Sequence, residues 1–139
     1  MHYLDASCCV ATLTPESGTT RASSWLEAHR EESLAISLWV HVEVASALSM
    51  KVRTGSLNQE DRAAAMLGWL SMRQSLRMLG VPAGHFAAAA RMVERDELNL
   101  RAGDALHLAV AAAHGCTLVT LDARMAKAAN GFGLPVAAI

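Results

Sequence analysis

Short runs of β-branched and aliphatic residues alternate along the chain with longer segments that have helical apolar spacing. The short runs predict strands and the longer segments predict helices, because side chains repeat every 2 residues in a strand and every 3.6 in a helix. Strands are expected over residues 2–5, 34–37, 76–81, 117–121 and 135–139. Helices are expected over residues 19–30, 39–53, 58–74, 82–95, 104–114 and 123–130, and a helical start follows the first strand.

Helix-end signals support these boundaries. Gly55 and Gly115 follow two of the helical segments, as C-terminal caps commonly do. Asn58 is the expected N-cap of the next helix, which has acidic residues in its first turn. Pro82 stands at the start of another, where its fixed backbone angle is tolerated.

The order of elements predicts an α/β fold with right-handed crossovers and a central, mainly parallel sheet flanked by helices. The strand over 117–121 does not alternate in polarity, which is typical of a strand covered on both faces. Ligands of such sheets bind outside the carboxyl ends of the strands, so the residues that follow the strands are candidates for chemistry. With 139 residues and no repeat or linker, the sequence predicts a single domain over residues 1–139.

Composition narrows the class of protein. Hydrophobic residues make up 53% and charged residues 18%, which excludes a disordered chain. No apolar run reaches the ~18 residues of a membrane span, and no basic segment with an apolar stretch begins the chain. We therefore expect no membrane contact, no signal peptide and a cytoplasmic location.

Charge and cysteine content exclude two further kinds of protein. The 12 Lys and Arg nearly balance the 13 Asp and Glu, so nucleic acid could be bound only locally rather than by a general basic coat. The three cysteines have no CxxC spacing, which argues against a disulfide framework and a zinc site. Reduced, buried cysteines are the expectation.

Two aspartates follow predicted strands. Asp5 ends the first strand and Asp122 comes directly after the strand over 117–121. Because parallel strands end at the same edge of the sheet, both carboxylates are expected at the carboxyl edge. Each could instead be only a helix N-cap that accepts a backbone N–H.

Two further carboxylates lie on helices. Asp104 begins an apolar helix, where its carboxylate must be capped, paired or bound to a metal. Glu43 lies inside the helix over 39–53, beside the apolar stripe of Val40, Val44 and Leu48. It cannot be an N-cap, and it either reaches water or points across the sheet edge at Asp5.

Four carboxylates that meet at one edge repel one another, by about 1 to 4 kcal/mol for a pair ~4 Å apart. A fold tolerates this when a cation binds or when some groups stay protonated. An all-oxygen site suits Mg²⁺ or Mn²⁺ rather than Zn²⁺. Such an acidic site is an arrangement for phosphodiester hydrolysis, in which bound metal activates water and stabilises charge on phosphorus.

Four segments resemble, in the same order, the motifs of one protein family. They are Tyr3-Leu4-Asp5-Ala6-Ser7, Glu43-Val44-Ala45-Ser46-Ala47-Leu48, Leu100-Arg101-Ala102-Gly103-Asp104-Ala105-Leu106-His107-Leu108-Ala109 and Leu118-Val119-Thr120-Leu121-Asp122-Ala123-Arg124. The chain is similar over essentially its whole length to PIN domains, specifically the VapC-type toxin ribonucleases of bacterial type II toxin–antitoxin systems. It departs from the common pattern at Ala6 and at Cys8 and Cys9, and neither change removes a charge.

The resemblance implies a PIN-like three-layer sandwich and assigns roles to six residues. Asp5, Glu43, Asp104 and Asp122 would be the catalytic carboxylates that bind Mg²⁺ or Mn²⁺. Ser7 and Thr120 would be catalytic-site hydroxyls that place a water or hold a carboxylate. The ordinary alternatives are a helix-start bond for Ser7 and a plain strand position for Thr120, and for Thr120 the alternative explains the residue about as well. Whether His107 and Arg101 contribute to the site stays open, because a hydrogen-bonded core histidine and a solvated arginine are the ordinary alternatives.

The function implied by the resemblance is a metal-dependent endoribonuclease toxin that leaves 5′-phosphate and 3′-hydroxyl ends on RNA. Its expected partners are RNA, with tRNA and rRNA among the candidate substrates, a second copy in a homodimer and a cognate antitoxin. DNA would be bound only through the antitoxin. The alternatives are a catalytically weak PIN-like module that binds RNA or protein, and another Mg²⁺-dependent phosphoryl-transfer domain, which would need a second aspartate soon after Asp5 or a Gly-rich phosphate loop.

Overall fold

The computed structural model describes residues 1–139 and contains one sheet of five parallel strands. The strands lie in the order β3-β2-β1-β4-β5, so the first strand is central. Their bounds are β1 (His2–Leu4), β2 (Leu34–Ser37), β3 (Arg77–Leu79), β4 (Thr117–Thr120) and β5 (Val136–Ala138). Tyr3 pairs with Ala35 of β2 on one side and with Leu118 of β4 on the other. The predicted sheet, described as mainly parallel, is parallel throughout.

Seven α-helices and two short 3₁₀ turns connect the strands. The helices are α1 (Ala6–Leu13), α2 (Thr19–Ala28), α3 (Leu38–Arg53), α4 (Gln59–Met72), α5 (Ala83–Val93), α6 (Ala102–Ala113) and α7 (Ala123–Gly131). The turns are η1 (Arg73–Ser75) and η2 (Asp96–Leu98). No helix is both long enough and apolar enough to cross a membrane.

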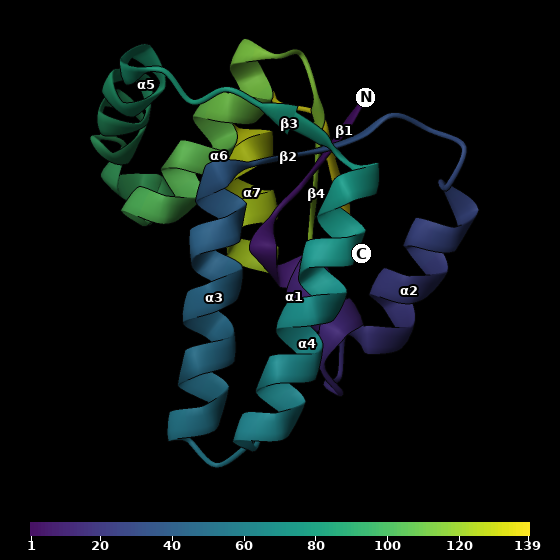
Figure 1. Ribbon diagram of the computed structural model, residues 1–139. Coiled ribbons are helices and arrows are strands. Elements are labelled where there is room, and N and C mark those ends of the chain that lie inside the picture. The colour runs from purple at the N-terminus through teal and green to yellow at the C-terminus, as the bar shows by residue number, and fades with distance from the viewer.

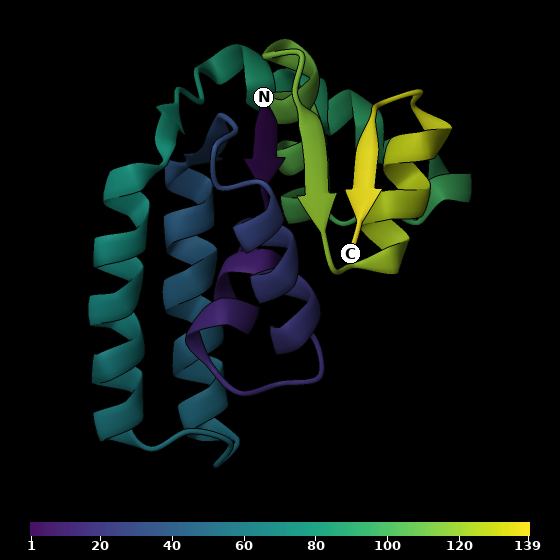
Figure 2. The same ribbon diagram turned by 90° about the vertical axis from the view of Figure 1, so that its right-hand side faces the viewer.

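Helices cover both faces of the sheet, which confirms the predicted α/β layers. In Figure 1, α6 and α7 lie on one side of the sheet and α2 and α4 on the other. Helix α5 packs on α6, and α1 packs on α2, α3 and α4. Figure 2 shows β1, β4 and β5 pointing the same way, with α3 and α4 extending past the ends of the strands. This places α3 beside the carboxyl edge.

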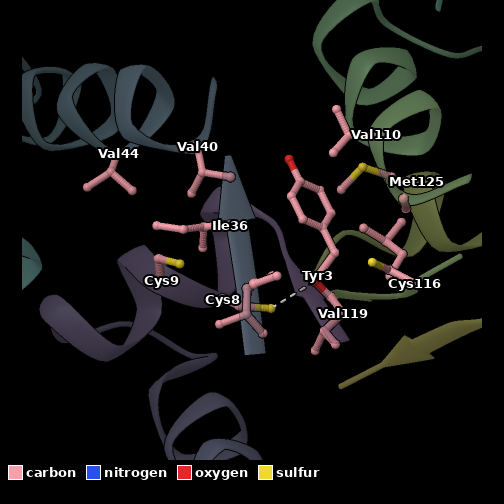
Figure 3. Close-up of a cluster of buried hydrophobic side chains, with 14 of the residues drawn as sticks. Tyr3, Cys8, Cys9, Ile36, Val40, Val44, Val110, Cys116, Val119 and Met125 are labelled. Atoms are coloured by element: carbon pink, nitrogen blue, oxygen red, sulfur yellow. Dashed lines mark hydrogen bonds between the residues drawn. The ribbon is translucent and has the colours of Figure 1, made fainter. Parts of the chain in front are cut away.

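The core is built from the strands and from the apolar faces of the helices. Figure 3 shows the Tyr3 ring directed into the space between α3 and α6, with Val40 and Val110 on its two sides. Tyr3, Val40 and Val110 are all fully buried or nearly so. The three cysteines are free and buried, as predicted, and burial raises the pKa of each thiol. The thiols are therefore protonated core groups rather than nucleophiles.

The predicted helix ends are largely confirmed. Asn58 caps α4 by accepting the Asp61 N–H at 2.7 Å. Gly55 and Gly115 follow α3 and α6 with φ values of 75° and 61°, which only glycine adopts without strain. The start of α6 differs, because this helix begins at Ala102 rather than at residue 104.

Candidate active site

Asp5 lies at the carboxyl end of β1 and is only 2% exposed. As the N-cap of α1, its Oδ1 accepts the Cys8 N–H at 3.0 Å. The Ser7 hydroxyl donates to both carboxylate oxygens at 2.7 and 2.8 Å, and the Thr120 hydroxyl donates to Oδ2 at 2.6 Å. Three donors therefore compensate the burial of this carboxylate. Asp5 is a helix N-cap, and it also lies at the carboxyl edge of the sheet, as predicted.

The same two hydroxyls join the ends of β1 and β4. Thr120 Oγ1 accepts the Asp122 N–H at 2.9 Å, and Ser7 Oγ accepts the Leu121 N–H at 3.0 Å. Each hydroxyl thus donates to Asp5 and accepts from the backbone that follows β4. The orientation of the Asp5 carboxylate is therefore set by residues from the first and last parts of the chain.

Asp122 is the N-cap of α7, as its alternative interpretation proposed. Its Oδ1 accepts the N–H groups of Arg124 and Met125 at 2.8 and 3.2 Å, and its Oδ2 contacts the Arg124 guanidinium at 3.3 Å. Partial burial acts against ionisation, but these donors and the arginine charge together hold the pKa of the carboxyl below its ordinary value. Asp122 is therefore an anion at neutral pH.

Asp104 is not a helix cap. The N-cap of α6 is Arg101, which is exposed, and Asp104 is the third helical residue and half-buried. Burial, and then the nearby Asp122 charge, raise the pKa of the Asp104 carboxyl above its ordinary value. A carboxylate in this position is stabilised by any cation that binds beside it.

Glu43 forms its side-chain hydrogen bond with His107. His107 Nε2 donates to Glu43 Oε2. Nδ1 of the same ring then accepts from the Tyr3 hydroxyl at 3.0 Å, and the Ser37 hydroxyl donates to the Tyr3 oxygen at 2.8 Å. Burial of Tyr3 raises the pKa of its hydroxyl, which therefore keeps its proton. This chain of bonds fixes the tautomer of His107 and the position of Glu43.

Gly103 allows Glu43 to approach the start of α6. A Cβ atom at this position would lie 3.1 Å from Glu43 Oε1 and 3.4 Å from the Trp39 ring. The side chain of Glu43 is 27% exposed, so one oxygen is held by His107 while the head group remains accessible at the surface. Helices α3 and α6 thereby bring Glu43 to the first turn that carries Asp104.

The four carboxylates gather around the carboxyl edge without close clustering. The Thr120 hydroxyl links the Asp5 carboxylate to the Asp122 N–H. The charge of Asp122 raises the pKa of Asp104, and Glu43 lies against Gly103, one residue before Asp104. No three of the four have oxygens that all lie within 4.8 Å of one another. A set of oxygen donors alone suits Mg²⁺ or Mn²⁺, which keep several waters and bind directly to only one or two protein carboxylates.

Sequence reasoning did not place three residues of this site. The sequence leaves the role of His107 open, and its position one turn after Asp104 is the signal that could assign it to the site. Tyr3 and Gly103 carried no such signal, because their roles depend on contacts between α3, β1 and α6. Arg101, also left open, makes no side-chain hydrogen bond or ion pair within the chain.

Comparison with known proteins supports the fold. Among solved structures, PAE2754 from Pyrobaculum aerophilum is 28% identical, with a TM-score of 0.68 over 91% of this chain and 84% of that chain. VapBC2 from Rickettsia felis bound to a promoter DNA fragment is 20% identical, with a TM-score of 0.71 over 99% and 98%. The Mycobacterium tuberculosis toxin VapC20, which cleaves the sarcin–ricin loop, is 19% identical, with a TM-score of 0.71 over 92% and 95%.

No curated protein matches the chain significantly. The PIN domain family model, in contrast, matches residues 2–131, which includes all four carboxylates and both hydroxyls of the site. The chain therefore belongs to the PIN domain family.

Proposed function

We propose that this protein is a divalent-metal-dependent endoribonuclease of the VapC type, the toxin of a type II toxin–antitoxin module. The observation that carries the proposal is the buried Asp5 carboxylate at the carboxyl edge of a PIN fold, which the Ser7 and Thr120 hydroxyls hold and which Thr120 links to the backbone N–H of Asp122. VapC20, a protein of the same fold, is described as cleaving the sarcin–ricin loop, which supports RNA as the substrate.

Each residue of the site has a defined task in this proposal. Asp5, Glu43, Asp104 and Asp122 would hold Mg²⁺ or Mn²⁺, which when bound would promote attack by water and stabilise charge at the phosphorus. Ser7 and Thr120 orient the Asp5 oxygens, and the backbone N–H groups of α7 keep Asp122 ionised. His107 holds Glu43 against α6, where the half-buried Asp104 has excess negative charge near it.

The partners follow from the same proposal. A toxin–antitoxin complex from Klebsiella pneumoniae shares the fold, which supports a cognate antitoxin. VapBC2, which also shares the fold, is bound to a fragment of its promoter, which supports a DNA contact provided by the antitoxin. A formal net charge of −1 leaves RNA binding to local arginines such as Arg101 and Arg124. We also propose that the protein is a homodimer and that it acts in the cytoplasm.

An RNA cleavage assay tests the activity. Purified, antitoxin-free protein is incubated with tRNA and total RNA under Mg²⁺, Mn²⁺ and EDTA, and the product ends are mapped. The double variant Asp5→Asn, Asp104→Asn should lose cleavage. The control double variant Glu94→Gln, Asp96→Asn removes two exposed carboxylates outside the site and should cleave as the parent does.

Metal-dependent cleavage by the parent and the control alone would support the proposal and its residues. Equal cleavage by the Asp5 and Asp104 variant would contradict the assigned site. Folded parent protein that cleaves no RNA with either metal would favour the PIN-like binding module instead.

A further inference from the structure

A second group of metal-ligating side chains lies at the opposite edge of the sheet. His2 begins β1, His29 directly follows α2, and Glu32 lies in the loop before β2. One ring nitrogen of each histidine and one oxygen of Glu32 all lie within 4.8 Å of one another. These residues are at the amino ends of the strands, whereas the acidic site is at the carboxyl ends.

His29 is held in the form that a metal ligand needs. Its Nδ1 donates to the Trp25 carbonyl at 2.7 Å, because a carbonyl oxygen can only accept. With Nδ1 as the donor, the lone pair that a metal would bind can only be on Nε2. The ring also stacks on Trp25 with centroids 3.9 Å apart, which limits its rotation. A backbone acceptor on the far nitrogen is the usual support of a metal-binding histidine.

His2 has no hydrogen-bond partner that a metal would have to displace, apart from Glu32. Its Nε2 lies 2.6 Å from Glu32 Oε2, and its Nδ1 is buried without a partner. The backbone fixes both residues, since His2 N–H donates to the Ser33 carbonyl and Glu32 N–H donates to the His29 carbonyl, each at 2.9 Å. A metal bound at Nε2 would take the place of the hydrogen on that atom, the neutral ring would carry its one N–H on Nδ1, and the Glu32 oxygen released from the hydrogen bond would bind the same ion.

The spacing of the two rings suits a shared ion. The centroids of His2 and His29 are 5.4 Å apart. Two imidazoles bound to one tetrahedral ion through bonds of about 2.1 Å have centroids about 5 Å apart. Two imidazole nitrogens and one carboxylate oxygen favour Zn²⁺, Co²⁺, Ni²⁺ or Cu²⁺ over Mg²⁺.

We propose that His2, His29 and Glu32 form a transition-metal site of the Zn²⁺ type, with water in the fourth position. The ion would join the start of β1, the end of α2 and the start of β2. Because these ligands come together only in the folded chain, the metal stabilises the native state. This site is independent of the proposed nuclease activity.

Cobalt absorption tests the proposal directly. Untagged, reduced protein is titrated with Co²⁺ in the presence of excess Mg²⁺, which occupies the carboxylate site, and Zn²⁺ is then added as competitor. One equivalent of Co²⁺ with a ligand-field spectrum, displaced by Zn²⁺, is the expected result. The single variants His2→Gln, His29→Gln and Glu32→Gln should each bind Co²⁺ at least about tenfold more weakly.

The pair His85 and His114 provides the matched control. Their rings are also perpendicular, with centroids 5.6 Å apart, but no carboxylate completes the group. The double variant His85→Gln, His114→Gln should therefore keep the parent's Co²⁺ affinity. Loss of binding in this control, retention in His29→Gln, or absence of binding by the parent would overturn the proposal.

Thermal unfolding gives a second measurement that does not depend on the Co²⁺ absorption spectrum. Saturating Zn²⁺ should raise the Tm of the parent and of the control by about 5 °C or more. The three ligand variants should fold, as circular dichroism would show, and should gain no such increase. An equal Zn²⁺-dependent increase in the ligand variants would place the bound metal elsewhere and contradict the site.

Discussion

At the scale of single residues, Asp5 and Asp122 show that a helix cap and a proposed metal ligand can be the same side chain. Each accepts backbone N–H groups at the start of a helix, and each still lies at the carboxyl edge of the sheet. The sequence predicted both positions but offered the two roles as alternatives. They are compatible because the backbone N–H groups of each cap reach only Oδ1, which leaves Oδ2 to other partners. These partners are the Ser7 and Thr120 hydroxyls at Asp5 and the Arg124 guanidinium at Asp122.

Thr120 provides the first prediction. Thr120→Val removes the hydroxyl that donates to Asp5 and accepts from Asp122 while keeping the shape of the side chain. Since the buried Asp5 carboxylate would lose a donor, the free energy of unfolding should fall by about 2 kcal/mol in urea denaturation. Thr117→Val, at the other end of β4 and partly exposed, is the control. Equal stability of Thr120→Val and the parent would show that the hydroxyl is not needed there.

Replacement of Asp104 should give a gain in stability that depends on pH. Burial and Asp122 raise its pKa in the folded state, so the native chain binds the Asp104 proton more tightly than the unfolded chain does. The ionised side chain therefore lowers stability as the pH rises through this raised pKa. Without metal, Asp104→Asn should increase the Tm by a few degrees at pH 7.

The difference should disappear as the pH falls below the ordinary aspartate value of about 3.9, where the parent's Asp104 is neutral as well. Urea unfolding in EDTA from pH 4 to pH 8 measures this dependence. Asp96→Asn, at an exposed position, should show none. A variant less stable than the parent at pH 7 would contradict the repulsion between Asp104 and Asp122.

His107 predicts a role in positioning Glu43. His107→Leu removes both of its hydrogen bonds and should lower the proposed RNA cleavage about 10- to 100-fold. His107→Gln can still donate to Glu43 and should keep more activity than the leucine variant. The two rates are compared across Mn²⁺ concentrations, because a displaced Glu43 should also weaken metal use. Equal losses in both variants would indicate a purely structural histidine.

At the scale of elements, the sequence predicted most helices and strands but not how α3 and α6 pack. The stripe of Val40, Val44 and Leu48 is buried as predicted, and Glu43 borders it. Its partner His107 is 64 residues away in the chain, and no local pattern encodes that contact. Helix α6 begins two residues before the predicted start, and this difference also comes from contacts between distant segments. Packing against Trp39 and Glu43 outweighs the low helix propensity of Gly103.

Two matched glycines test this packing. Gly103 and Gly84 are each the second residue of a helix, in α6 and α5, but only at Gly103 would a Cβ meet other atoms, namely Glu43 and Trp39. Gly103→Ala should reduce the proposed RNA cleavage about tenfold or more by displacing Glu43. Gly84→Ala should keep full activity and gain up to about 1 kcal/mol in stability. Activity that falls equally in both variants would refute the close approach of Glu43.

At the scale of the whole molecule, the strand order could not be read from the sequence, since the alternation of strands and helices is compatible with several orders. The order β3-β2-β1-β4-β5 places Asp5 between neighbours from distant parts of the chain. An apolar groove is a second feature that only the fold shows. It is lined by side chains of α3, β3 and α5, including Trp39, Val42 and Phe86.

This groove predicts how the proposed homodimer is held together. Val42 and Phe86 both line the groove and are each 54% exposed, and exposed apolar patches of this kind mark protein–protein contacts. Val42→Glu, Phe86→Glu should convert a dimer to a monomer in light scattering after gel filtration. Leu67→Glu, which alters a 69% exposed leucine of α4 outside the groove, should leave the protein a dimer in the same measurement. A dimer that persists in the double variant would exclude the groove as its interface.

The hydrogen bond between Asp5 and Thr120 spans 115 residues, and this determines when during synthesis the site can form. The ribosome produces Asp5 well over a hundred residues before Thr120 and Asp122, since Asp5 and its hydrogen-bond partner Thr120 are 115 residues apart. Until β4 has emerged, β1 lacks one neighbour and Asp5 lacks one of its donors. A chain whose translation stops before Thr120 thus has no assembled site, and the proposed activity can arise only after this residue has been made.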